Sequence, residues 1–225
     1  EGDSFVFDYH LMWDINRDFG GFTLTKVLYN DLRQIKKLGL NGFISCQINR
    51  CTFPSGFALF VLGRTLFDNS VSFETLRDEY FGQVFGENRD TVVDFLQGLS
   101  QYFPLKYNRG EFGEYVGKEY ADLFIKGKQH IEKFISVINP LCDRMEFTPS
   151  GRAYLVLKSC AELFYDAADI LIYKASGADI KYLKTLADNF CCKVSRLTPV
   201  LQKDLDDFYF MMILNGIFVD GAVKM

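Results

Sequence analysis

Two short stretches near the start of the chain carry the side chains best suited to chemistry. Asp8, His10 and Trp13 follow one apolar run, and Gln47 and Arg50 follow a second. An indole ring can stack on a sugar, while polar groups of these kinds hydrogen-bond to its hydroxyls. We expect Asp8 to accept a hydroxyl hydrogen bond, His10 to donate one and Trp13 to stack. Gln47 would supply an amide fork, and Arg50 would clamp a carboxylate or a hydroxyl.

The same residues also have a structural interpretation. Asp8 and His10 can instead tie the ends of the strands together, with Trp13 packing beside them. Cys46 and Cys51 flank the predicted site, but no histidine is placed to activate either thiol as a nucleophile. On spacing alone, the carbohydrate site and the structural rim remain open alternatives.

The rest of the chain offers no signature of a cofactor or a metal. Six cysteines lack the paired spacing of a zinc site, and no glycine-rich phosphate loop occurs. We therefore expect no cofactor and no metal, and free thiols in a reducing compartment, with the cytoplasm as the location. Asp204, Asp206 and Asp207 form an acidic cluster that we expect to be exposed at the start of a helix.

The predicted site depends on a short α/β segment. Apolar runs at 5–8 and 42–47 predict two strands, and stretches at 23–38 and 57–67 predict a helix after each. A strand–helix–strand unit pairs its strands in parallel, and neither run alternates, which is typical of strands covered on both faces. Because two such strands do not form a stable sheet alone, we expect them to belong to a larger one.

The remainder of the sequence predicts helices. The strongest period runs through Tyr120, Phe124 and Ile131 and is expected to end at Pro140. Thr198-Pro199 has the pattern of a cap and a first helical residue, so a last helix is expected to start there. The fold class is mainly α with a small parallel βαβα opening, divided into residues 1–70 and a helical bundle over 71–225. We expect Phe124, Ile131, Phe164 and Phe190 to lie in the core of that bundle.

Composition excludes several classes of partner. The hydrophobic fraction is 48%, charged residues make up 24%, and the net charge is −4. This balance is typical of a globular protein and argues against nucleic acid or an anionic membrane as partner. No apolar stretch reaches the length of a membrane span. We therefore expect no nucleic acid and no membrane among the partners.

Three segments together resemble a known family. The segments read "FDYHLMWD", "LYNDLRQIKKLGLNGFISCQINR" and "LGRTLFD" followed by "FETLRDEYFGQVFG". They are similar to a large bacterial family of domains of unknown function. Its members look like glycoside hydrolases, with a barrel related to those of alpha-glucuronidases and beta-N-acetylhexosaminidases. The likeness covers roughly residues 5–100.

The resemblance implies that residues 5–67 are the last two βα units of a (β/α)8 barrel, followed by a helical domain. Glycoside hydrolysis needs two carboxyl groups, and this chain can offer at most one of them, Asp8 or Asp14. The expected function is therefore the C-terminal part of a glycoside-hydrolase-like protein that binds carbohydrate and is inactive alone. Its other partner would be a second copy or the missing N-terminal part of the same protein.

A different class of function fits the sequence as well. The chain can be a non-catalytic helical module for interaction or assembly, whose βαβ opening docks onto a partner. The coding sequence before Glu1 separates the two hypotheses. Further βα units with paired acidic residues favour the hydrolase, and a start codon beside Glu1 favours the module.

Overall fold

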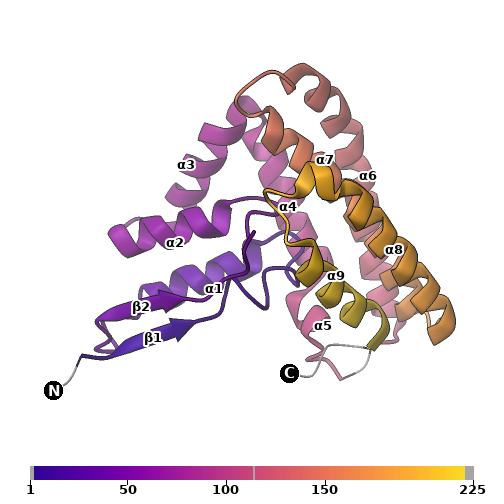
Figure 1. Ribbon diagram of the computed structural model, residues 1–225, viewed down its shortest axis with the longest axis horizontal. Coiled ribbons are helices and arrows are strands. Elements are labelled where there is room, and N and C mark those ends of the chain that lie inside the picture. Colours follow the sequence, from indigo (N-terminus) through magenta and orange to yellow (C-terminus); the bar gives the residue numbers. More distant parts are fainter. Residues whose placement is uncertain (1–2, 114, 221–225) are drawn as a thin grey trace.

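The computed structural model describes residues 3–113 and 115–220 and is mainly helical with one small sheet (Figure 1). The first part of the chain forms a βαβα unit. Its elements are β1 (Phe5–Asp8), α1 (Phe22–Leu32), β2 (Gly42–Ser45) and α2 (Phe57–Phe67). The helices that follow are α3 (Phe73–Phe85), the short η1 (Gly86–Asn88), α4 (Arg89–Tyr102), α5 (Leu105–Arg109), α6 (Lys118–Met145), α7 (Gly151–Ala175), α8 (Ile180–Leu201), α9 (Asp207–Asn215) and the π-helical η2 (Gly216–Asp220).

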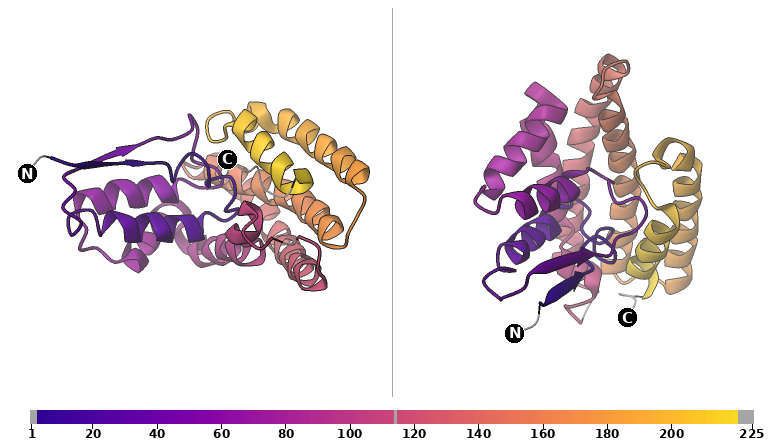
Figure 2. Two further views of the ribbon diagram at one scale, coloured as in Figure 1. Left: turned by 90° about the horizontal axis from the view of Figure 1, so that it is seen from below. Right: turned by 60° about the vertical axis from the view of Figure 1, so that its left-hand side comes forward.

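The two strands pair in parallel, as the sequence predicts. Phe5 lies opposite Gly42 and Phe7 opposite Ile44, and the described residues add no third strand. Both α1 and α2 lie on the same side of this sheet, as Figure 2 shows. Leu24 and Leu28 of α1 and Ala58 of α2 share a small buried cluster there.

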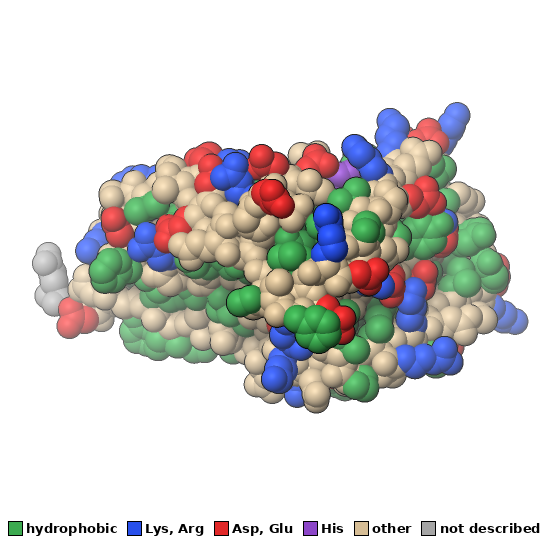
Figure 3. All heavy atoms as spheres, turned by 90° about the horizontal axis from the view of Figure 1, so that it is seen from above, with side chains coloured by type: hydrophobic (Ala, Val, Ile, Leu, Met, Phe, Trp, Pro, Cys, Tyr) green, Lys and Arg blue, Asp and Glu red, His purple; other side chains and the backbone are tan. Residues whose placement is uncertain are grey.

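The prediction that both faces of the sheet are covered is wrong for the described residues. Successive strand residues point to opposite faces, so the face away from α1 carries Phe5, Phe7 and Ile44. Their exposed fractions are 61%, 49% and 46%. Figure 3 shows hydrophobic side chains gathered at this end of the molecule, near the N-terminal residues. Both faces of the strands do carry apolar side chains, but no described segment packs against this second face.

The bundle core was predicted correctly. Phe124, Ile131, Phe164 and Phe190 are all at most 2% exposed. The prediction that Pro140 ends its helix is wrong, because α6 continues through it to Met145. A proline inside a helix costs about 3 kcal/mol. Burial of Ile138 and Leu141 on either side of it offsets that cost.

The start of the last helix was also predicted wrongly. Pro199 lies in the last turn of α8, and α9 begins after Asp206, whose carboxylate accepts a hydrogen bond from the backbone N–H of Tyr209 at 3.3 Å. An aspartate cap therefore sets this helix start. As a result the buried face of α9 carries Phe210 and Ile213, while Phe208 is 66% exposed.

The loop between β1 and α1 joins the sheet unit to the helices. Asp18 is 1% exposed, and its carboxylate accepts hydrogen bonds from Ser100 Oγ at 2.6 Å and Leu24 N–H at 2.7 Å. Phe19 stacks on Phe164 of α7 at a centroid distance of 4.3 Å. The main hydrophobic core thus includes side chains from before and after residue 70. The division into two domains stays a prediction.

Within the described ranges, no helix is both long and apolar enough to cross a membrane.

Candidate functional site

The structure brings Asp8 and His10 together at the carboxyl end of β1. Asp8 is the last strand residue, is 6% exposed and faces α1. Its carboxylate accepts hydrogen bonds from the His10 backbone N–H and from Ser45 Oγ, both at 3.3 Å, and contacts the ring Nδ1 of His10. These contacts fix the position of the carboxylate between the ends of the two strands.

The other side of the His10 ring faces a residue that the sequence analysis missed. His10 Nε2 lies 3.1 Å from Asp31 Oδ2 on α1. The hydrogen bond that the ring donates to Asp8 raises the pKa of His10, burial opposes this rise, and the charges of Asp8 and Asp31 add to it. Twenty-one positions separate His10 from Asp31, so no local spacing pairs them. The imidazole is therefore a well-placed hydrogen-bond donor between two carboxylates.

A pocket of about 310 Å³ opens beside this cluster. Asp8, His10 and Asp31 form part of its lining, and the remainder is mostly apolar side chains of β1, α1 and the loop before β2. It lies on the helix side of the sheet, because Asp8 and His10 both turn toward α1. The open apolar face of the sheet is on the opposite side.

Trp13 and Asp14 lie in the loop after β1 and contact the helical part of the chain. The Trp13 ring meets Tyr209 of α9 edge-on at a centroid distance of 6.4 Å. Asp14 accepts two hydrogen bonds from Arg109 of α5, at 2.5 and 3.1 Å, and lies 3.5 Å from Arg17 Nη1. Both oxygens of Asp14 are thus already engaged by arginines, a geometry suited to holding this loop in place.

Gln47 and Arg50 lie in the loop after β2 and are exposed. Neither side chain makes a hydrogen bond or an ion pair to another described residue, so both can meet a ligand. The two loops are joined, because the Ile48 N–H donates to Leu11 O at 3.2 Å. Asp8, His10 and Gln47 therefore lie within two residues of the strand ends at one edge of the sheet, while Trp13 and Arg50 lie further along the two loops.

The end of this second loop is held by the segment between α8 and α9. Cys51 and Leu205 form an isolated antiparallel bridge, and Thr52 Oγ1 donates to Asp204 Oδ1 at 3.1 Å. Asp204 also pairs with Arg152 of α7. The prediction of an exposed acidic cluster is thus wrong: Asp204 bonds to a loop, Asp206 is buried and caps α9, and Asp207 is half-buried and accepts from Thr198. Their pattern in the sequence is that of any acidic helix start, and only the tertiary fold distinguishes them.

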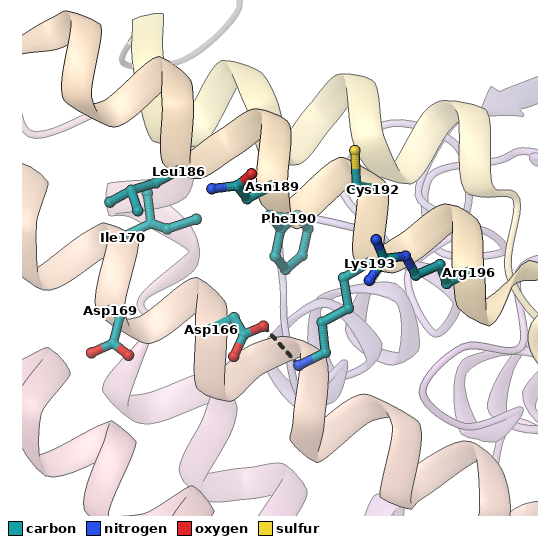
Figure 4. A pocket seen from close by; sticks show the side chains of 9 residues that line it. All are labelled: Asp166, Asp169, Ile170, Leu186, Asn189, Phe190, Cys192, Lys193 and Arg196. Atoms are coloured by element: carbon teal, nitrogen blue, oxygen red, sulfur yellow. Dashed lines mark hydrogen bonds and ion pairs between the residues drawn. The ribbon is translucent and has the colours of Figure 1, made fainter.

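A larger hollow, of about 550 Å³, lies between α7 and α8, on different elements from the strand ends (Figure 4). Ile170, Leu186 and Phe190 contribute apolar side chains, and Lys193 crosses it to pair with Asp166 at 2.7 Å. It contains none of the residues that the sequence predicts for the carbohydrate site. Asp166 and Asp169 already pair with Lys193 and Lys128, while Arg196 makes no ion pair with another described residue.

The described residues hold no group of three histidine, cysteine or acidic side chains placed to bind a metal ion. The side chains near the edge of the sheet offer hydrogen bonding and aromatic contact. Comparison with protein families, with curated proteins and with solved structures finds no match to this chain. The family resemblance of its segments therefore stays a prediction.

Proposed function

We propose that this chain binds a carbohydrate at the carboxyl edge of β1 and β2, as the C-terminal part of a glycoside-hydrolase-like protein. The observation that carries the proposal is the parallel pairing of the strands with their two following loops joined. Trp13 comes from one loop, and Gln47 and Arg50 come from the other. An aromatic ring, an amide and a guanidinium at one edge can stack on a sugar and bind its hydroxyls.

The placement of both helices of the βαβα unit on one face of its sheet supports a barrel as the fold of the complete protein. In a barrel all helices lie outside the sheet, whereas a doubly wound sheet carries helices on both faces. Here α1 and α2 lie on one face (Figure 2), and Phe5, Phe7 and Ile44 occupy the other. Barrel interiors are filled by bulky apolar side chains of this kind. In the complete protein these residues would face the barrel interior, and the open edges would pair with further strands.

The roles of the residues follow from their contacts. Trp13 would stack on the sugar, and Gln47 and Arg50 would bind hydroxyls. His10 and Asp8 would hold the rim in place, because both ring nitrogens of His10 lie against carboxylates and the oxygens of Asp8 are occupied by protein donors. Hydrolysis requires a second carboxyl group at a defined separation. The chain would therefore bind sugar without hydrolysing it, and would require another copy or the N-terminal part of the protein for catalysis. The six free cysteines fit a cytoplasmic location.

The proposal is tested by calorimetric titration of the protein with a panel of mono- and oligosaccharides. Trp13→Ala removes the stacking face and is expected to weaken binding by about 1–2 kcal/mol, or roughly 5- to 30-fold. Phe208→Ala is the matched control, because Phe208 is an exposed aromatic residue on the neighbouring helix α9. Equal affinities for the Trp13 variant and the unmodified protein would refute the stacking role.

A second candidate function rests on a different observation. The open sheet face with Phe5, Phe7 and Ile44 is also what a docking module would present to a partner. In this case the chain would be a non-catalytic assembly module. Light scattering then gives a stable oligomer or complex that Phe7→Ser disrupts, and sugars do not bind. The coding sequence before Glu1 gives an independent answer, as set out above.

A further inference from the structure

We propose a second sugar subsite, in a pocket of about 320 Å³ where the loop after β2 meets α3, α7 and the segment after α8. It extends the carbohydrate-binding function proposed above and depends on it. Its lining includes Thr52, Ser55, Tyr80, Arg152 and Asp204. The pocket is at the lower end of the range for ligand sites, a size suited to one sugar ring.

The charges of the pocket indicate a neutral ligand. Arg152 pairs with Asp204, and its Nη2 also donates to Val200 O at 3.3 Å. Thr52 Oγ1 donates to the other oxygen of Asp204 at 3.1 Å. One cation and one anion cancel, so the pocket has no net charge from these groups and does not select for an anion. A paired carboxylate and guanidinium still offer both an acceptor and donors to hydroxyl groups.

Two hydroxyl groups in the pocket have hydrogen-bonding capacity left over. The Tyr80 hydroxyl accepts the Gly56 N–H at 2.8 Å, and no acceptor for its own proton lies among the described residues. Burial raises the pKa of Tyr80 to about 12, so the group remains a donor at neutral pH. Ser55 Oγ makes no hydrogen bond within residues 3–113 and 115–220. A sugar hydroxyl can accept from both.

The pocket also has an apolar side. Pro149, Ala153 and Val156 contribute to the lining beside the ring of Tyr80. A pyranose ring presents C–H groups on one face and hydroxyls around its edge, which matches a pocket with one apolar and one polar wall. Neither an ionic nor a wholly apolar ligand would use both walls. This combination points to a neutral sugar ring.

The test is a two-dimensional NMR titration of the 225-residue protein with glucose, galactose, xylose and N-acetylglucosamine, and with glucuronate as a charged comparison. The amide of Gly56 reports on the pocket, and the single tryptophan indole, of Trp13, reports on the rim. We expect a neutral sugar to shift the Gly56 signal saturably below roughly 50 mM. The two signals are independent. A Trp13 indole signal that does not shift therefore leaves open whether a sugar shifts the Gly56 amide signal in the pocket.

Two variants sharpen the test without breaking the pair of Arg152 and Asp204. Ser55→Ala removes one donor and is expected to weaken binding at the pocket about fivefold. Ala153→Phe fills the pocket and is expected to abolish the Gly56 response. Gln129→Phe adds the same side chain at an exposed position on α6 as a control. The proposal is overturned if no neutral sugar shifts Gly56, if glucuronate alone does so, or if Ala153→Phe, folded by its amide spectrum, leaves the response intact.

Discussion

Replacing Gly20 by alanine tests how the sheet unit is joined to the helices. A Cβ at this position would lie 1.8 Å from the backbone oxygen of Leu96 and 2.6 Å from Ser100 Oγ. The oxygen of Leu96 belongs to α4 and has little freedom to move. Overpacking of this kind costs about 1–3 kcal/mol, and a contact with backbone belongs at the top of that range. Alanine also lowers the conformational entropy of the unfolded chain, which offsets about 0.4–1 kcal/mol of this loss in stability.

The expected net loss is about 2 kcal/mol or more, which lowers the melting temperature of a chain of this length by roughly 4–8 °C. Differential scanning calorimetry measures it. Gly63→Ala is the matched control, because no atom lies within 4 Å of its added Cβ on α2. There alanine should stabilise the helix by about 0.5–1 kcal/mol. If Gly20→Ala melts at or above the temperature of the unmodified protein, the loop does not pack on α4 as described.

Three further predictions follow from the core, the strand ends and the missing carboxyl group. Phe164→Ala, which removes the ring stacked on Phe19, should cost about 3–5 kcal/mol in chemical denaturation, and a loss below 1 kcal/mol would contradict the core described here. In an NMR titration His10 should show a pKa above its ordinary 6.5, and Asp8→Asn should lower it. Since the folded pKa is raised, the stability from His10 is full below about pH 6.5 and is lost as the pH rises through the folded value. With aryl glycosides the protein should show no turnover, and measurable hydrolysis would mean that it holds a complete pair of catalytic carboxyls.

Local patterns were enough to predict the two strands, most of the helices and the bundle core. The parallel pair of strands and the buried stripe through Phe124 and Ile131 follow from hydrophobic periodicity, which depends on nearby residues. The helix boundaries predicted at Pro140 and Pro199 were wrong because a proline inside a helix costs only a limited free energy. Packing of long helices against one another exceeds that amount, and packing depends on residues far away in the chain.

The candidate site was predictable only in part, for the same reason. Asp8 and His10 are two positions apart, so their contact follows from the sequence. Asp31 of α1, Arg109 of α5 and Asp204 of the segment after α8 contact the two loops from far along the chain, and each looks like an ordinary solvated charge in the sequence. The Tyr80 pocket was missed because its walls come from segments that no sequence period connects.

The most direct test of the rim is the fluorescence of Trp13, because this is the only tryptophan in the chain. The protein is titrated with the sugars of the calorimetric panel, and free tryptophan amide at the same absorbance corrects for solvent effects. The proposed function predicts a saturable change in intensity or emission wavelength with at least one sugar, at the affinity found by calorimetry. Sugar binding in the calorimeter with no change at Trp13, or no binding by either method, would contradict a carbohydrate site at the carboxyl edge of β1 and β2.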